Sequence, residues 1–436
     1  MDFKEAEDWL YSIPRFAKKN EVEKTKQFLD EEIGDFSKSI PTIHVAGTNG
    51  KGSVCAYLRA ALNECGLKVG LFTSPHLVSV LERFMIDDNM MSEREFTNTL
   101  EYVRSLISDF NKKTGNEKYF PTFFEFLFFM AAVWFKNKKP DVIVLETGLG
   151  GRLDATNSIG EKKISVITEI GLDHTEYLGN TKEEIAFEKA GIIKENTPVV
   201  FFNKEESVSD VIRNRAKELN APTYEVSVKN IKNYETNNAG IDFSVQSLYD
   251  GFVEMVLNTK ALYQTENALI AFRTLEVLSK DFPLKLDSKD YVKGLSKMNW
   301  PGRMETVSDR FLVDGGHNED GIKAFLESVK TFDYKKKELL FSAVSDKDID
   351  KAASLIKESK LFDKIYVCKL SSYRASSLER LKEAFKDVEN VEYFDNVAEG
   401  IGKMISDRSS DTYSFAVGSL YLVGEIKALI YEEETI

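Results

Sequence analysis

A glycine-rich turn between an apolar run and a helical stretch carries one lysine and one serine. It reads Gly47-Thr-Asn-Gly-Lys-Gly-Ser53 and follows the apolar run Ile40–Ala46. Glycines without a Cβ let an anion approach backbone N–H groups, and the positive end of the following helix points at the same place. Lys51 adds a positive charge, and Ser53 adds a hydroxyl of the kind that binds Mg2+. The turn therefore predicts a nucleotide-phosphate site.

The turn departs at two positions from the common phosphate-binding pattern G-x-x-x-x-G-K-[ST]. Val45 stands where the first glycine belongs, and Gly52 separates the lysine from the serine. By itself this variant loop is compatible with any enzyme that hydrolyses or transfers a nucleotide phosphate.

Polar residues follow three further apolar runs. Ser74 and His76 come after the second run, Glu146 ends the third, and His174 comes after the fourth. Because open α/β sheets bind ligands beyond the carboxyl ends of their strands, we expect these groups to surround the phosphate loop. A hydroxyl, a carboxylate and an imidazole there would form a metal shell for ATP chemistry. Taken singly, Glu146 could be a cap or a surface ion pair, and each histidine could make a structural hydrogen bond.

The chain has four histidines, and all of them lie in or beside such segments: His44, His76, His174 and His317. This placement at strand ends favours a functional role for most of these histidines over a chance distribution. His44 lies inside its strand rather than at the end, so we assign it to packing.

The elements that position these groups alternate between short apolar runs and helical periodicity, which is typical of an α/β fold with a mostly parallel sheet. Predicted strands are Thr42–Ala46, Lys68–Thr73, Val142–Glu146, Ile164–Thr168 and Pro198–Phe202. Predicted helices are Ser53–Cys65, Glu93–Thr114, Phe123–Lys136, Lys182–Ile193 and a later one from about Gln264 to Leu278. The polar stretch from Ser227 to Asn238 predicts hairpins or loops.

A Pro-Gly pair in Met298-Asn-Trp-Pro-Gly-Arg303 breaks the regular pattern, and the alternation then restarts. We predict an N-terminal phosphate-loop domain over residues 1–300 and a smaller Rossmann-like α/β domain over 301–436. Strands predicted in the second domain are Phe311–Asp314, Glu338–Ala343, Lys364–Leu370, Val391–Phe394 and Ser414–Val417.

The composition argues against several classes of protein. The 436 residues carry a formal net charge of −13, unlike a nucleic-acid surface of clustered Lys and Arg. Three cysteines without a CxxC pair fit packed thiols in a reducing compartment, and Met1–Asp8 lacks the order of a secretion signal. The most apolar segment, Phe123–Phe135, has about 13 residues against the roughly 20 of a membrane helix. We expect a cytoplasmic monomer without nucleic-acid or membrane partners.

Seven short motifs stand in order along nearly the whole chain: Gly47-Thr-Asn-Gly-Lys-Gly-Ser53, Thr73-Ser-Pro-His76, Glu146-Thr-Gly-Leu-Gly-Gly-Arg152, Gly171-Leu-Asp-His174, Glu188-Lys-Ala-Gly-Ile192, Asp314-Gly-Gly-His-Asn318 and Gly418-Ser-Leu-Tyr421. Together they closely resemble the folylpolyglutamate synthase and dihydrofolate synthase branch of the Mur ligase family. The unusual phosphate loop is the normal form in that family.

The resemblance implies ATP-dependent amide ligation through an acyl phosphate that the amine of L-glutamate then attacks. It implies a catalytic role for Lys51, His174, Lys189 and His317. The nucleotide would bind to Gly47, Thr48, Asn49, Gly50, Lys51, Gly52 and Ser53, with Asn267 near the adenine, Arg303 at a phosphate and Asp314 at the ribose. Two Mg2+ ions would be held by Ser53, Ser74 and Glu146, and by Glu146, His174 and Lys189.

Lys189 would act as a metal ligand after reaction with CO2, because carbamylation turns its amine into a carboxylate-like group. The alternative from the residues alone is an exposed helix lysine paired with Glu184 or Glu188. The alternative for Arg303 is a domain-interface ion pair, and for Asp314 a helix cap.

The resemblance also implies substrate contacts for a pterin or folate and for glutamate. The expected residues are Glu82, Arg83, Phe123, His317 and Ser419, with Phe120 as a further aromatic candidate; aromatic residues at helical spacing are also typical of a core. Two positions depart from the family pattern: Tyr263 replaces the histidine of a His-Gln-x-x-Asn stretch, and Gly316 stands where alanine is commoner.

Three functions remain open at this point. A folate–glutamate ligase is favoured, and the use of both dihydropteroate and tetrahydrofolate is the broadest form of that prediction. A cell-wall Mur ligase would place a nucleotide-sugar-binding domain ahead of the phosphate loop, whereas here the loop begins at Gly47. A phosphate-loop ATPase without ligase activity would not require a second domain with Asp314 and His317.

Overall fold

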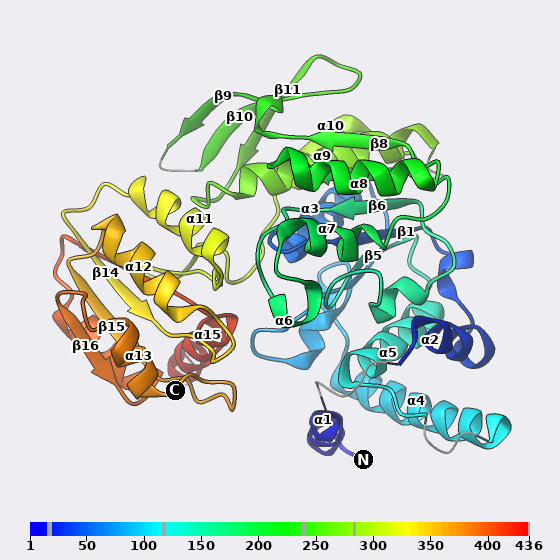
Figure 1. Ribbon diagram of the computed structural model, residues 1–436, viewed down its shortest axis with the longest axis horizontal. Helices are drawn as coiled ribbons and strands as arrows, with labels where there is room; N and C mark the ends of the chain where they lie inside the picture. The colour runs from blue at the N-terminus through cyan, green and yellow to red at the C-terminus, as the bar shows by residue number, and fades with distance from the viewer. Residues whose placement is uncertain (15–19, 116–118, 238–239, 282–284, 435–436) are drawn as a thin grey trace. The chain divides into compact units, whose positions relative to one another are not determined.

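The computed structural model describes residues 1–14, 20–115, 119–237, 240–281 and 285–434 (Figure 1). Contacts between Cα atoms divide the chain into two compact units. The first unit comprises Met1–Asn233, Phe243–Leu257 and Glu266–Met298, and the second comprises Tyr234–Asp242, Asn258–Thr265 and Asn299–Ile436.

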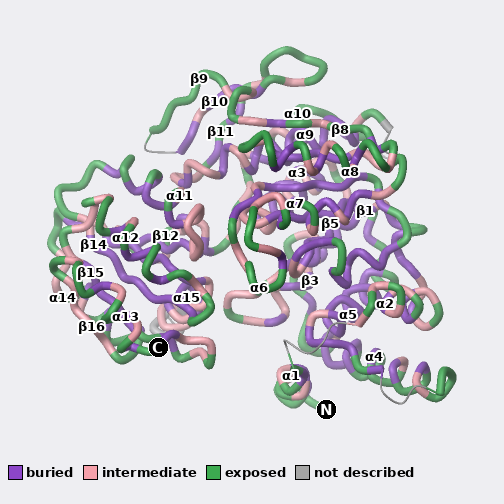
Figure 2. Tube along the Cα trace, in the orientation of Figure 1, coloured by how far each residue is buried: buried purple, intermediate pink, exposed green. Residues whose placement is uncertain are grey.

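The first unit is built on an eight-stranded sheet in the order β4-β3-β2-β5-β1-β6-β7-β8. The six strands from β2 to β8 in that order run parallel, and β3 and β4 extend the β2 edge as antiparallel strands. The central strands are buried along their length, as expected when helices cover both faces (Figure 2). The strands are β1 Thr42–Ala46, β2 Val69–Phe72, β3 Phe84–Ile86, β4 Asn89–Met90, β5 Val142–Glu146, β6 Ile164–Ile167, β7 Val199–Phe202 and β8 Thr223–Val226.

Capping boxes begin several helices of this unit. The side chains of Ser92, Thr122 and Thr181 each accept from the backbone of a glutamate three residues later, whose carboxylate returns to the cap. The helices are α1 Phe3–Ser12, α2 Val22–Phe28, η1 Leu29–Ile33, η2 Phe36–Lys38, α3 Lys51–Glu64, η3 Val80–Arg83, α4 Glu93–Thr114, α5 Phe123–Lys138, η4 Ala155–Ser158, α6 Thr175–Leu178, α7 Lys182–Ala190, α8 Glu206–Glu218, α9 Gln264–Asp281 and α10 Ser288–Ser296.

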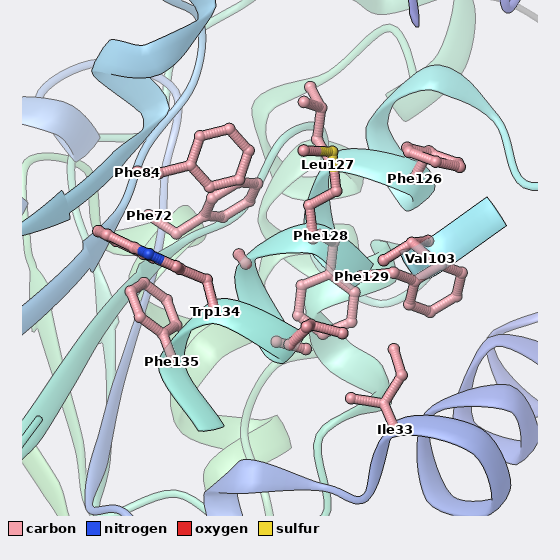
Figure 3. Packing of buried hydrophobic residues seen from close by; sticks show 14 of the residues in the cluster. Ile33, Phe72, Phe84, Val103, Phe126, Leu127, Phe128, Phe129, Trp134 and Phe135 are labelled. Atoms are coloured by element: carbon pink, nitrogen blue, oxygen red, sulfur yellow. The ribbon is translucent and has the colours of Figure 1, made fainter. Parts of the chain in front are cut away.

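Helix α5 is buried on nearly every side. Phe126, Leu127, Phe128 and Phe129 pack with rings from other elements in a single hydrophobic cluster (Figure 3). The apolar run in the sequence is therefore a buried helix, as predicted. Across the described residues, every helix is too short or too polar to cross a membrane.

A small sheet in the order β11-β10-β9 precedes α9 in the chain, and its strands are β9 Ile231–Thr236, β10 Ile241–Gln246 and β11 Phe252–Leu257. The polar segment predicted as hairpin or loop supplies η5 Val228–Asn230 and β9. Its last residue, Asn238, lies outside the described residues.

The second unit has its own six-stranded sheet in the order β12-β13-β17-β14-β15-β16, parallel except for the pairing of β12 with β13. All five predicted strands are present, with ends that differ by up to two residues. The elements are β12 Glu305–Ser308, β13 Phe311–Val313, α11 Glu319–Lys330, β14 Lys336–Phe341, α12 Ile349–Ser359, β15 Lys364–Cys368, α13 Leu378–Ala384, β16 Val391–Phe394, α14 Val397–Asp407, β17 Thr412–Val417 and α15 Leu420–Glu434. The predicted α/β architecture with two parallel-rich sheets is confirmed.

Candidate active site

The strand order β2-β5-β1-β6 brings four of the predicted segments to neighbouring carboxyl ends of the first sheet. β1 pairs with β5 at Val45 and Glu146, and with β6 at Ala46 and Ile167. β2 pairs with β5 on its other side. The phosphate loop after β1 therefore lies between Glu146 and the segment that leads to His174.

Two glycines of the phosphate loop have no room for a side chain. A Cβ on Gly47 would lie 1.8 Å from the Thr168 Oγ1, and a Cβ on Gly50 would lie 2.2 Å from the Asn267 Oδ1. Gly50 also has φ of 84° where it begins α3, a left-handed conformation that favours glycine. The close approach of Asn267 places this predicted adenine contact against the phosphate loop.

Two residues of the phosphate loop donate their N–H groups to a backbone carbonyl outside the loop. The N–H groups of Thr48 and Asn49 donate to the Glu169 carbonyl over 2.8 and 3.3 Å, and the Thr168 hydroxyl donates to the Asn49 carbonyl over 2.6 Å. The N–H groups of the first turn of α3, from Lys51 to Ser53, have no acceptor within the helix. We expect the anion-binding groups at this helix start, whereas Thr48 and Asn49 hold the loop to Glu169, two residues after β6. The spacing of residues in the sequence does not show which N–H groups bind the anion and which attach the loop to its neighbour.

Lys51 and Lys189 both donate to one carbonyl oxygen. The Lys51 Nζ lies 3.1 Å from the Gly47 carbonyl oxygen and 3.1 Å from that of Thr48, and the Lys189 Nζ lies 2.6 Å from that of Gly47. Lys189 is only 3% exposed. Burial, and next the charge of Lys51, hold the pKa of Lys189 well below its usual range. Burial therefore disfavours the charged form of this amine.

The reading of Lys189 as an exposed, ion-paired helix lysine is wrong. Glu188 instead pairs with Arg152 over 2.8 Å, and the Glu184 carboxylate accepts the N–H groups of Asn180 and Thr181. Helical periodicity could not show this burial, because the loop at Gly47 covers the lysine from elsewhere in the chain.

Glu146 is 2% exposed at the end of β5, and its carboxylate accepts the Ser74 N–H over 2.9 Å. Ser53 is buried in the first turn of α3. A carboxylate and two hydroxyls are hard oxygen donors that suit Mg2+. In the part of the chain that the structure describes, no group of three or more His, Cys, Asp and Glu side chains could hold a metal. The predicted metal set has just two such residues, Glu146 and His174, so it depends on hydroxyls and on Lys189.

His174 begins the short helix α6 with φ of 50°. Asp173 accepts the His174 N–H over 2.9 Å, and its other oxygen lies 4.0 Å from the His174 Nε2. The Asp173 carboxylate therefore lies near the imidazole that is predicted to bind a metal. Sequence reasoning missed a role for Asp173, although it stands next to the histidine in the motif.

The predicted folate contacts lie in a polar and aromatic cluster. The Arg83 Nε donates to the His76 Nδ1 over 2.9 Å, and the Tyr11 hydroxyl lies 3.3 Å from the His76 Nε2. The Phe123 ring stacks on Tyr11 at 5.9 Å, and the Arg83 guanidinium lies 5.7 Å from the Phe123 ring centre. Tyr11 was not foreseen, because nothing near it in the sequence marks it.

Two further substrate candidates lie elsewhere. The Glu82 carboxylate accepts the N–H groups of Leu77, Val78 and Ser79 over 2.7 to 2.8 Å, so it shapes the loop before η3. Phe120 is 65% exposed.

Three predicted residues of the second unit, Asp314, His317 and Ser419, follow two adjacent strands, since β13 pairs with β17 at Val313 and Ala416, whereas Arg303 lies in the turn before β12. Asp314 is buried directly after β13, and burial raises the pKa of its carboxyl while the nearby Arg303 opposes that rise. The His317 Nδ1 lies 2.8 Å from the Gly315 carbonyl oxygen. Ser419 is buried before α15 and accepts the Tyr421 N–H over 3.0 Å.

The structure thus groups the predicted residues by unit. The first unit holds Gly47–Ser53, Ser74, Glu146, His174, Lys189 and Asn267, and the second holds Arg303, Asp314, His317 and Ser419. His44 lies apart from both groups in the buried interior of β1, where its Nε2 is 2.8 Å from the Thr156 Oγ1. Its assignment to packing is confirmed. Cys55 and Cys368 are buried free thiols, and Cys65 is half-buried and free.

Comparison with known proteins agrees with this arrangement. Residues 45–275 match the Mur ligase middle domain, and residues 302–419 match the Mur ligase glutamate ligase domain. The dihydrofolate synthase/folylpolyglutamate synthase of Bacillus subtilis is 32% identical over 98% of both chains. A folylpolyglutamate synthase structure from Mycobacterium tuberculosis complexed with ADP is 27% identical over 98% of both chains, with a TM-score of 0.89.

A structure of E. coli FolC in complex with DHPP and ADP is 25% identical, with a TM-score of 0.85, and the alignment covers 100% of this chain and 99% of that one. Both halves of the sequence thus match along their length, and the segments that carry the resemblance stand at strand ends of the two sheets, except for Glu188–Ile192 at the end of α7. The chain belongs to the folylpolyglutamate synthase and dihydrofolate synthase branch of the Mur ligase family.

Proposed function

We propose that this chain is an ATP-dependent ligase that joins L-glutamate to the carboxylate of a folate-type substrate. The observation that carries the proposal is the phosphate loop with a buried Glu146 on one side and the buried amine of Lys189 donating to the loop itself. A simple nucleotide switch does not need that amine. The match of residues 302–419 to a glutamate ligase domain supports the same activity.

The reaction requires two anions to meet. A substrate carboxylate attacks the γ-phosphate of ATP and forms an acyl phosphate as ADP leaves. The glutamate amine then attacks the acyl carbon, and the tetrahedral intermediate loses inorganic phosphate and a proton to give the amide. The N–H groups at the start of α3 and the Lys51 ammonium would hold the phosphates, and Arg303 would add a positive charge. Asn267 would contact the adenine and Asp314 the ribose, with His317 and Ser419 near the phosphate or the incoming glutamate. Residues 1–300 would form the ATP-binding domain and 301–436 the glutamate ligase domain.

The donor set fits Mg2+, which when bound would neutralise phosphate charge. Ser53, Ser74 and Glu146 would hold one ion, and Glu146, His174 and a carbamylated Lys189 the other. Carbamylation requires a neutral amine, and the burial that lowers the pKa of Lys189 favours that form. Mass spectrometry of the native protein in labelled bicarbonate should show one added CO2 that Lys189→Met abolishes; an unmodified Lys189 would remove this part of the proposal.

The folate ring would lie against Phe123 and Arg83, whose positions are set by Tyr11 and His76. Glu82 would contribute through the loop that it shapes. The Bacillus subtilis relative is named for both synthase activities, which supports the use of both dihydropteroate and tetrahydrofolate. We further propose that the protein works as a cytoplasmic monomer.

Product analysis tests the activity directly. The purified protein, ATP and glutamate are offered dihydropteroate or tetrahydrofolate separately, and the products are identified by mass spectrometry. A conjugate one glutamate heavier, with ATP consumption that depends on both other substrates, is expected. ATP hydrolysis that continues undiminished without them, and without conjugate, would instead identify a phosphate-loop ATPase.

A further inference from the structure

Asp314, the predicted ribose contact, has a hydrogen-bond donor on each carboxylate oxygen within its own unit. The Tyr263 hydroxyl donates to its Oδ2 over 2.5 Å, the Met304 N–H donates to the same oxygen over 3.0 Å, and the Gly316 N–H donates to its Oδ1 over 2.8 Å. Tyr263 is also the residue at which the sequence departs from the family's histidine. The Tyr263 hydroxyl thus donates to a buried carboxylate, and such a hydrogen bond is strong because little solvent screens it.

The turn that Asp314 holds is strained. Met304 is a bulky residue with φ of 47°, and Gly302 has φ of 73°. A left-handed conformation is unfavourable for a non-glycine residue, so it persists only where the surroundings hold it. The Glu305 carboxylate accepts the Gly302 N–H over 2.7 Å, and the Gly302 carbonyl accepts the Gly315 N–H over 2.9 Å. The bond from the Met304 N–H to Asp314 holds the other end of the turn.

Arg303 lies between these two anchored residues. Its Nη1 donates to the Gly302 carbonyl over 3.0 Å, and the same atom would lie 2.3 Å from a Cβ on Gly315. The guanidinium therefore crosses directly over Gly315, and its direction follows from the backbone of the turn. The contact with Gly315 leaves little freedom for another path.

Tyr263 itself is held firmly enough to act as an anchor. The preceding residue donates its N–H to the Ser328 hydroxyl over 3.0 Å, and Ala261 is buried in the core of the second unit, against which the Tyr263 ring packs. The Lys260 ammonium lies 5.1 Å from the Phe332 ring centre. The segment 260–263 is thus part of the second unit and presents the phenol to Asp314 from a fixed place.

We propose that Tyr263 is a positioning residue for nucleotide binding: its hydroxyl orients the Asp314 carboxylate, which holds the strained turn at Met304 and so aims Arg303. This inference rests on the proposed function, in which Arg303 meets an ATP phosphate. Tyr263 acts through Asp314 and Arg303 and needs no contact of its own with the nucleotide.

Tyr263→Phe tests the inference, because it removes the hydroxyl and keeps the ring. We expect the KM for ATP, and the Kd of a non-hydrolysable ATP analogue measured by calorimetry, to rise about tenfold, which corresponds to the loss of one hydrogen bond to a charged group. The kcat and the KM for glutamate should stay within about twofold, since the lost bond acts on nucleotide binding. Tyr334→Phe, at a part-exposed tyrosine of the same unit, is the matched control and should change neither constant.

A double-variant cycle separates positioning from direct contact. In an Arg303→Ala background, Tyr263→Phe should raise the analogue Kd clearly less than in the wild type, because only the part of its effect that passes through the contact of Asp314 with the ribose remains. An equal loss in both backgrounds, or no loss in the wild-type background, would overturn the inference. A wild-type protein that forms no conjugate would overturn the proposed function instead, and the analogue-binding cycle would still decide the role of Tyr263.

Discussion

At the scale of single residues, the site is defined by how two lysines are arranged. The ammonium of Lys51 and the amine of Lys189 meet at the Gly47 carbonyl. Two positive charges so close together are unfavourable, and burial makes the charge on Lys189 the costlier of the two. The two lysines therefore differ in environment, and burial disfavours the charged form of Lys189, although the residue type is the same.

Lys51→Ala should abolish most of the activity without unfolding the protein. Removal of one preorganised cation from a phosphoryl-transfer site costs about 3–4 kcal/mol of transition-state stabilisation, so kcat/KM for ATP should fall roughly a hundredfold to a thousandfold. Steady-state kinetics and a thermal melt measure the two effects. Lys217→Ala, at an exposed position of α8, is the control. Turnover near the wild-type value in Lys51→Ala would exclude the phosphate assignment.

At the scale of elements, the phosphate loop is a piece of backbone held by its neighbours. The carbonyl of Glu169, just after β6, accepts two N–H groups of the phosphate loop, and the Asn267 side chain near the start of α9 lies against Gly50. In the proposed site the start of α3 binds the anion. The loop sequence alone specifies the glycines, whereas the contacts of the loop with Glu169 and Asn267 depend on the tertiary structure.

Gly50→Ala and Gly66→Ala form a matched pair. Both glycines have similar positive φ, 84° and 81°, but a Cβ on Gly66 meets nothing within 4 Å, whereas a Cβ on Gly50 meets Asn267. Each should destabilise the protein by about 1 kcal/mol for the left-handed backbone. Only Gly50→Ala should weaken binding of an ATP analogue, by about tenfold or more, because it displaces Asn267. Equal analogue affinities in the two variants would show that Asn267 lies outside the nucleotide site.

His44 inside β1 predicts a dependence of stability on pH. Burial, and next the charge of Lys162, hold the pKa of His44 well below its ordinary value of 6.5. Below that pH the unfolded chain therefore binds a proton that the folded chain does not, and the free energy of unfolding should fall by up to about 1.4 kcal/mol per pH unit. Above it, both states are neutral and the contribution is constant.

Denaturant unfolding of the wild type and of His44→Gln between pH 7 and acidic pH, roughly 5, isolates this contribution. The wild type should lose more stability than the variant over that range. Parallel curves for the two proteins would mean that His44 takes up a proton in the folded state as readily as in the unfolded one.

At the scale of the whole molecule, the chain forms two units, each with its own core. The second unit has a cluster of aromatic and aliphatic residues around Phe415, whose ring lies 5.2 Å from that of Phe332. The first has the cluster around α5. The segment Asn258–Thr265 belongs to the second unit, although the helix that it leads into, α9, lies mostly in the first.

Separate cores predict separate unfolding transitions in differential scanning calorimetry. Phe415→Ala should destabilise the second unit, and Phe128→Ala the first, each by about 3–5 kcal/mol from lost burial and the cavity left behind. Each variant should lower one transition and leave the other near its wild-type temperature. A single transition that both variants lower equally would contradict independent cores.

Most of the fold could be predicted from the sequence. The strands β1, β5 and β16 begin and end at the predicted residues, because buried apolar runs bounded by turn residues have few other conformations available. The start of α3 differs: it lies at Lys51 rather than Ser53, since the left-handed Gly50 already serves as the cap. The locations of the phosphate loop, Glu146 and His174 at neighbouring strand ends also followed from the pattern, since parallel strands share a carboxyl edge.

The sequence by itself determined the α/β class, the order of the strands along the chain, the phosphate loop and the family, because these depend on local periodicity and on residues that stand close together in motifs. Only the tertiary structure decided that Lys189 is buried, that Glu82 shapes a loop and that Tyr263 meets Asp314. Those facts depend on desolvation and hydrogen bonds between residues far apart in the chain. No local pattern encodes them, because the burial of one side chain depends on which distant segment folds over it.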